Sequence, residues 1–153
     1  DYERLERRNI RKRAVIAMPG EENMTAIRIL IADDHELLRR GIRMLLDSHP
    51  GWEVCGEAMD GLDCLEKTKE LMPDLVVVDM TMPGIDGLEA TRRIRSEAPA
   101  VNVLMLSQYE SSQMLCAALS AGARGFVSKM DASRDLVKAI ETILAGAPPQ
   151  EHV

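Results

Sequence analysis

The sequence has few aromatic residues and few cysteines, and it contains no long hydrophobic run. Phe, Trp and Tyr make up 3% of the 153 residues, so any core must be aliphatic. The three cysteines are widely spaced, which favours apolar residues in a reducing compartment over disulfides or a zinc site. No apolar run reaches the roughly 18 residues of a membrane helix, and the amino terminus lacks the apolar centre of a secretory signal. We therefore predict a cytoplasmic protein with no membrane partner.

Several common ligand-binding motifs are also missing. The sequence has no G-x-x-x-x-G-K-[ST], G-x-G-x-x-G, H-E-x-x-H or paired C-x-x-C, so no motif supports a nucleotide or zinc site. The net charge of −6 is unfavourable for a protein that binds nucleic acid on its own. With 46% hydrophobic and 29% charged residues, the composition is that of a globular domain.

The charges divide the chain into an arm and a domain. Six cations and five acids lie in residues 1–23, and the sequence from Met18 to Asn23 contains Pro and Gly, which end helices. We predict that residues 1–23 are a flexible basic arm or the remnant of an upstream segment. Residues 24–146 form the domain, and residues 147–153 are a tail or the start of a linker.

Short apolar segments alternate with helical patterns from Ile27 onward. Strands are predicted at 27–32, 52–58, 74–80, 101–107 and 125–128. Helical patterns run from Leu38 to Leu46, from Leu62 to Met72, over 87–97, over about 110–121 and from Leu136 to Gly146. Five such strand–helix units imply right-handed crossovers and an α/β fold, with a parallel sheet covered by helices on both faces.

Polar residues gather where these predicted strands end. Ligands of open parallel sheets bind outside the carboxyl ends of the strands, and those ends carry Asp33, Asp34, Asp79, Ser107 and Lys129. Three neighbouring carboxylates repel one another unless a cation compensates their charge. Oxygen ligands without a cysteine pair or a histidine cluster favour Mg²⁺.

This set of residues suits phosphoryl transfer. Asp79 ends the most apolar strand and is the best candidate for a nucleophile that forms an aspartyl phosphate. Asp33 and Asp34 would hold the metal, while Lys129 and Ser107 would contact phosphoryl oxygens. Taken singly, the acids also have structural interpretations, as residues of a helix start or a turn. We interpret His35 as a solvated residue beside a helix start rather than a ligand.

The sequence of these segments resembles that of the receiver domain of two-component response regulators. The resemblance spans about residues 26–146 and is most like the subfamily with a C-terminal helix-turn-helix output domain. It rests on the order and spacing of four segments: IRILIADDHELLRRGIRMLL, DLVVVDMTMPGIDGLEATRRIR, VLMLSQYE and GARGFVSKMD.

The resemblance implies a doubly wound (βα)5 sandwich with strand order 2-1-3-4-5. It also implies that Asp79 accepts a phosphoryl group from a histidine kinase and that Mg²⁺ is the cofactor. The implied residue roles fall into three groups: metal ligands Asp33, Asp34, Asp79 and Thr81; phosphoryl contacts Ser107, Lys129 and Gln108; and switch residues Ser107 and Phe126.

The implied partners are a histidine kinase and, as an open alternative, a second copy of the chain. Only seven residues follow Gly146, so DNA would be contacted only through an output domain absent from this chain. The expected role is a signalling phosphoacceptor, not an enzyme, with at most intrinsic autophosphorylation and autodephosphorylation. Two alternatives stay open: an aspartate-nucleophile phosphatase, which generally needs a second Asp at the position of Thr81, and a receiver-like interaction domain that does not use phosphate.

Overall fold

The computed structural model describes residues 25–109 and 111–148, which form five alternating strand–helix units. The predicted arm, residues 1–23, lies outside the described residues, and the limits of the domain and tail stay predictions. The elements in chain order are β1 Ile27–Ala32, α2 Glu36–Asp47, β2 Trp52–Ala58, α3 Gly61–Leu71, β3 Leu75–Asp79, α4 Gly87–Glu97, β4 Asn102–Ser107, α5 Ser112–Ala121, β5 Gly125–Ser128, a 3-10 turn Lys129–Asp131 and α6 Ala132–Leu144.

Two predicted helices end earlier than expected. Helix α3 stops at Leu71, because Met72 has a φ of 46° and precedes Pro73, which disfavours helical angles at the residue before it. Helix α6 stops at Leu144, and Gly146 then has a φ of 82°. Both ends use a left-handed residue to leave the helix, as helix termini commonly do.

The five strands form one parallel sheet of order β2-β1-β3-β4-β5, so the predicted fold class and strand order are confirmed. Strand β3 lies at the centre, and all five of its residues are buried. The register of β1 against β2 shifts between Ile29 and Leu30, where Cys55 has no partner. Strand order reverses between β1 and β3, and in open parallel sheets ligands bind beside the carboxyl ends of the strands at such a point.

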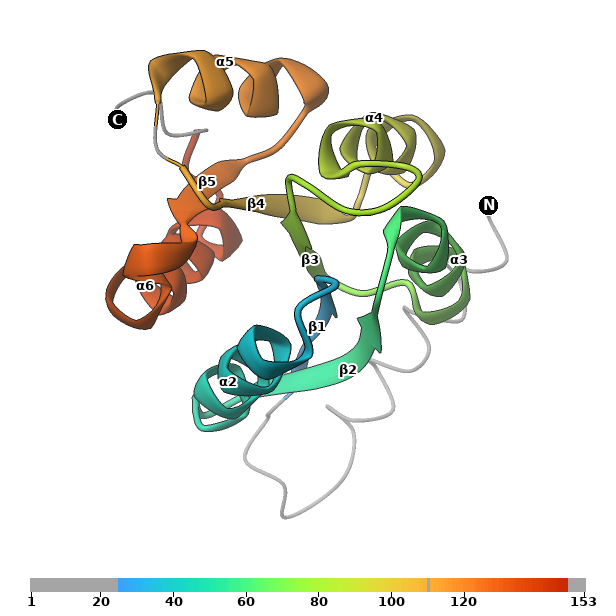
Figure 1. Cartoon of the computed structure of the whole chain (residues 1–153). Helices are drawn as coiled ribbons and strands as arrows, with labels where there is room; N and C mark the ends of the chain where they lie inside the picture. Colours follow the sequence, from blue (N-terminus) through green and yellow to red (C-terminus); the bar gives the residue numbers. More distant parts are fainter. Residues whose placement is uncertain (1–24, 110, 149–153) are drawn as a thin grey trace.

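Alternate residues of each strand pack into two separate cores. Leu30 and Ala32 of β1 belong to the core under α3, α4 and α5, whereas Ile29 and Ile31 belong to the core under α2 and α6. The same helices lie on the two sides of the sheet in Figure 1. Side chains of successive strand residues point to opposite faces, so a strand buried on both sides must be apolar throughout.

Three side chains join the loop before β2 to α6, at the amino end of the parallel strands. The rings of His49 and Trp52 stack with their centroids 3.6 Å apart. His49 Nε2 lies 3.3 Å from a carboxylate oxygen of Glu141 in α6. Trp52 is the only tryptophan of the chain and begins β2.

The three cysteines are unpaired, which agrees with the sequence prediction against disulfides. Cys64 is fully buried in α3, and its burial raises the thiol pKa to about 12, so it stays protonated. Cys116 departs from the apolar interpretation given to the three cysteines, because it is exposed on α5. Among the described residues, no helix has both the length and the hydropathy to span a bilayer.

The aliphatic core predicts a large cost for truncating a buried leucine. Leu104 in β4 is fully buried, whereas Met44 on α2 is 75% exposed. We expect Leu104→Ala to lower the free energy of unfolding by about 2–5 kcal/mol, through lost burial and the remaining cavity. Met44→Ala should change it by no more than about 0.5 kcal/mol. Urea unfolding followed by circular dichroism measures both, and equal losses would contradict this assignment of the core.

Candidate functional site

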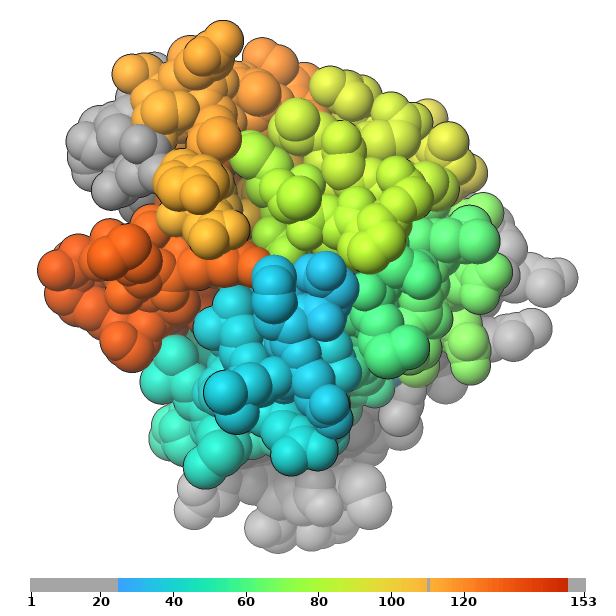
Figure 2. Space-filling model, viewed as in Figure 1, coloured from blue at the N-terminus to red at the C-terminus, as the bar shows by residue number. Residues whose placement is uncertain are grey.

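Three carboxylates meet beside the carboxyl ends of β1 and β3. Asp79 is the last residue of β3, and Asp33 and Asp34 directly follow β1. Asp33 is fully buried and Asp79 is 2% exposed, while Asp34 lies at the surface. Figure 2 shows the segment after β1, in blue, meeting the segments after β3, in yellow-green, and β5, in orange-red, on one face of the molecule.

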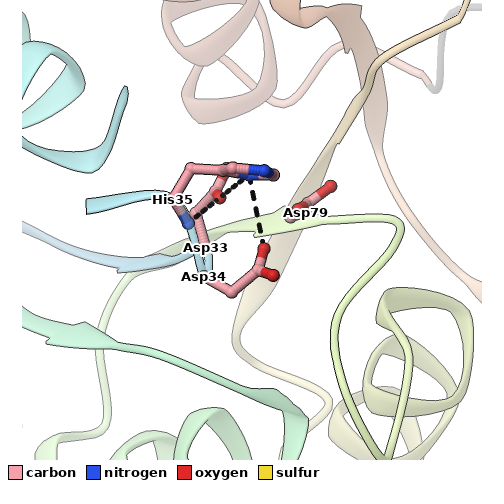
Figure 3. Close-up of side chains that lie close together, drawn as sticks. All are labelled: Asp33, Asp34, His35 and Asp79. Atoms are coloured by element: carbon pink, nitrogen blue, oxygen red, sulfur yellow. Dashed lines mark hydrogen bonds and ion pairs between the residues drawn. The ribbon is translucent and has the colours of Figure 1, made fainter. Parts of the chain in front are cut away.

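The imidazole of His35 joins this cluster. Each of the four residues Asp33, Asp34, His35 and Asp79 offers one ligand atom, and these atoms all lie within 4.8 Å of one another. His35 Nδ1 lies 3.0 Å from Asp33 Oδ1 and 3.4 Å from Asp34 Oδ1 (Figure 3). Our interpretation of His35 as a solvated residue holds for much of its side chain, which is 62% exposed, but its Nδ1 atom contacts both acids.

Lys129 brings a positive charge into the cluster. It begins the 3-10 turn after β5, and its ammonium lies 3.0 Å from Asp79 Oδ2 and 3.1 Å from Asp33 Oδ2. This contact spans the sheet from β5 to β3 and β1, as the ends of parallel strands allow. One ammonium cannot balance three carboxylates, so the cluster has excess negative charge when all three are ionised.

Burial and the neighbouring charges together shift the pKa of two groups. Burial raises the pKa of Asp79, and the charge of Asp33 adds to that effect, although hydrogen bonding to Lys129 opposes both. Burial lowers the pKa of Lys129, but its contacts with Asp79 and Asp33 outweigh burial and leave the pKa above its usual value. Lys129 is therefore charged at neutral pH, and ionisation of Asp79 costs more than in water.

The cluster suits a divalent cation. Asp33 Oδ2 and Asp79 Oδ2 are buried and share the single ammonium of Lys129, and neither accepts another hydrogen bond among the described residues. Buried charges that are incompletely compensated are costly. Carboxylate oxygens are the ligands that Mg²⁺ prefers, so Asp33, Asp34 and Asp79 fit the predicted cofactor.

Of the four other predicted site residues, Thr81 has a direct contact with the cluster. The backbone N–H of Thr81 donates to Asp79 Oδ1 at 3.1 Å, and the Thr81 side chain is exposed. Ser107 ends β4 and is 2% exposed, but its hydroxyl donates to the carbonyl of Tyr109 at 2.6 Å. Gln108 is exposed, and Phe126 is half-buried against the core under α3, α4 and α5. The structure brings together the acids and Lys129, whereas the Ser107 hydroxyl is bound to its own loop.

A buried arginine beside the acids was missed by the sequence analysis. Arg39 in α2 is 8% exposed, and it donates to the carbonyl of Asp33 at 2.7 Å and to Glu57 at 2.8 Å. Burial tends to raise the pKa of Glu57, but hydrogen bonds from Arg43 and Arg39 outweigh it, so the pKa is lowered. Arg39 lies three and seven residues before the buried Ile42 and Leu46. This helical spacing places Arg39 on the buried face of α2, and it is the feature of the sequence from which its burial could have been predicted.

Comparisons with known proteins agree with this geometry. A model of the response regulator receiver domain matches residues 29–141. The response regulator GacA of Pseudomonas aeruginosa is 39% identical over 120 residues, which cover 78% of this chain and 56% of GacA. This chain thus spans about half the length of the curated relatives it matches.

Two solved structures are also similar. A two-component response regulator of the LuxR family from Aurantimonas has a TM-score of 0.78 at 39% identity, covering 83% of this chain and 91% of that one. The isolated receiver domain of RcsB from Salmonella enterica, in the presence of the phosphomimetic BeF3−, has a TM-score of 0.75 at 28% identity, covering 81% and 92%.

The first residue of α4 leaves no room for a side chain beside Asp79. A Cβ atom at Gly87 would lie 2.1 Å from the Asp79 carbonyl oxygen, whereas a Cβ at Gly41 in α2 would meet nothing within 4 Å. We expect Gly87→Ala to lower the free energy of unfolding by about 1–3 kcal/mol. Gly41→Ala should instead raise it by about 0.5–1 kcal/mol, as alanine favours helix. Thermal unfolding tests both, and a neutral Gly87→Ala would show that the backbone of Asp79 yields freely.

Because the pKa of Asp79 is raised, we predict that replacing it with a neutral residue increases the free energy of unfolding in a pH-dependent way. A carboxyl whose pKa is higher in the folded state lowers stability as pH rises from the unfolded value, 3.8, through the folded value. Asp79→Asn should therefore be more stable than the wild type at pH 7 without metal, and the difference should shrink as pH falls toward 3.8. Thermal unfolding in EDTA across this range measures it. A variant less stable than the wild type at pH 7 would contradict the prediction.

Proposed function

The chain belongs to the response regulator receiver domain family, and from this premise we propose that it receives a phosphoryl group on Asp79 from a histidine kinase. Receiver domains are signalling modules of two-component systems and not conventional enzymes. The observation that carries the proposal is the meeting of Asp79, Asp33 and Lys129 at one sheet edge, with the Lys129 ammonium 3.0 and 3.1 Å from the two acids.

The proposed reaction needs a nucleophile and compensation of charge. A carboxylate oxygen of Asp79 attacks the phosphorus atom, a P–O bond forms, and the P–N bond to the donor histidine breaks, leaving its electron pair on the imidazole. Lys129 is close enough to Asp79 to neutralise an oxygen of the incoming phosphoryl group. Phosphoryl transfer depends mainly on such positioning and charge stabilisation.

Asp33, Asp34 and Asp79, with the main-chain carbonyl of Thr81, are the proposed holders of Mg²⁺. The metal, when bound, supplies positive charge that screens the phosphoryl oxygens from the acids. The buried oxygens of Asp33 and Asp79, which share one ammonium and accept no further hydrogen bond among the described residues, support this assignment. Lys129 contacts Asp79 Oδ2 and the backbone N–H of Thr81 donates to Asp79 Oδ1, so together they orient this carboxylate.

We propose Ser107 and Phe126 as the switch, with Gln108 as a further contact of the phosphoryl group. The Ser107 hydroxyl is bound to the Tyr109 carbonyl, so it must break this 2.6 Å bond to reach a phosphoryl oxygen. A phosphoryl group would thus favour a second packing of the segment after β4. Phe126 lies half-buried on the next strand and would repack with it.

The domain limits, the cellular location and the partners are also proposals. We propose that residues 24–146 are the receiver, with residues 1–23 and 147–153 as arm and tail. The exchange with the kinase would take place in the cytoplasm, and a second copy of the chain is a further candidate partner. Control of transcription would require a DNA-binding output region, which is proposed by analogy with longer relatives such as GacA.

Treatment with acetyl phosphate and Mg²⁺ tests the phosphoacceptor directly. We expect intact-mass spectrometry to show addition of one phosphoryl group, lost in Asp79→Asn and retained in Asp135→Asn, whose exposed carboxyl lies outside the cluster. An adduct that persists in Asp79→Asn would refute the assignment. Sustained turnover of a phosphate ester would favour the phosphatase alternative, and an unmodified wild type would favour the interaction domain.

A further inference from the structure

Arg39 is a buried cation that the proposed chemistry does not use. It lies on the inner face of α2 with Ile42 and Leu46 and is only 8% exposed. Taking a guanidinium out of water is costly unless its donors are paired. Its contacts therefore indicate the role of an arginine on the otherwise apolar face of α2.

Those contacts fix the peptide that joins two acids of the cluster. Arg39 donates to the carbonyl oxygen of Asp33 at 2.7 Å, and this carbonyl belongs to the Asp33–Asp34 peptide. The N–H of Asp33 donates to the carbonyl of Ala58 in β2 at 3.0 Å. Asp33 is thus held on both sides of its α-carbon, by α2 and by the neighbouring strand.

The second contact of Arg39 orients its guanidinium. Its Nε atom donates to Glu57 at 2.8 Å, and Glu57 lies in β2 beside the carboxyl end of β1. Arg43, one turn further along α2, donates to the other carboxylate oxygen of Glu57. Arg43 is 45% exposed, and no hydrogen bond from it to Asp33 is present among the described residues. The two arginines share one partner but differ in the contact with Asp33.

We propose that Arg39 is a positioning residue for the divalent-cation site, acting through the Asp33–Asp34 peptide to set the directions of both carboxylates. The inference rests on the proposed cation site but not on phosphoryl transfer. Mg²⁺ requires near-ideal octahedral geometry at short distances, whereas Ca²⁺ accepts irregular geometry. Loss of a residue that orients ligands typically costs 10- to 100-fold in metal affinity.

The sign of the effect separates positioning from simple electrostatics. If Arg39 acted only as a charge, its removal would take away a repulsion and tighten cation binding. Positioning predicts weaker binding instead. It also predicts a greater loss for Mg²⁺ than for Ca²⁺, whereas general damage to the fold would weaken both ions alike.

The test is titration of the full chain with Mg²⁺ and with Ca²⁺, followed by NMR shifts of the His35 amide, which donates to Asp33 Oδ1. For Arg39→Met we expect a roughly 10- to 100-fold weaker affinity for Mg²⁺ and a smaller loss for Ca²⁺. Arg43→Met is the matched control, because it removes the same charge from Glu57 and leaves the Asp33 contact. It should bind both ions as the wild type does.

Arg39→Lys keeps the charge but has a single donor nitrogen in place of the guanidinium. Its affinity for Mg²⁺ should therefore lie between those of the wild type and Arg39→Met. If Arg39→Met does not fold, the ratio of Mg²⁺ to Ca²⁺ affinity in Arg39→Lys decides the question. Unchanged or tighter Mg²⁺ binding, equal losses for both ions, or an equal effect in Arg43→Met would overturn the proposal. So would a wild type that binds neither ion. Failure of phosphorylation at Asp79 with normal Mg²⁺ binding would refute the proposed function alone.

Discussion

Repulsion between the carboxylates of Asp33, Asp34 and Asp79 is the constraint on which the carboxyl edge of this sheet depends. Parallel strands end at the same edge, so the fold itself forces these acids together. The ammonium of Lys129 reduces the repulsion without removing it. Burial raises the pKa of Asp79, and the charge of Asp33 adds to that effect, so ionisation of Asp79 at this crowded edge is disfavoured. A bound metal ion would reduce the negative charge of the cluster, and this would lower the electrostatic repulsion of an incoming phosphoryl group.

The surrounding fold keeps that unfavourable arrangement rigid. Strands β1 and β3 are buried on both faces, so the ends that carry the acids are held by two cores at once. Gly87 packs against the backbone of Asp79, and Arg39 fixes the carbonyl of Asp33. The stability of the aliphatic core thus offsets the cost of crowding charges at the edge.

Much of this arrangement could be predicted from the sequence, because it follows from simple patterns. Short apolar runs located the strands and period-3.6 hydrophobicity located the helices, and the rule for parallel sheets selected Asp33, Asp79 and Lys129. Contacts that depend on one rotamer could not be predicted this way. Examples are the Ser107 hydroxyl bound to Tyr109, the Nδ1 atom of His35 among the acids, and the reach of Arg39 from α2 to the end of β1. Ends of α3 and α6 were misplaced because left-handed residues terminate them locally.

The position of Trp52 determines what the intrinsic fluorescence of this protein can report. The only indole of the chain stacks on His49 at the start of β2, a whole strand away from the acids at the other edge. A strand of this kind spans roughly 20 Å, and the excited state of an indole senses mainly its immediate surroundings. Emission from Trp52 therefore records the integrity of the junction between β2 and α6. A spectral change on modification of Asp79 would mean that the rearrangement had crossed the full length of the sheet.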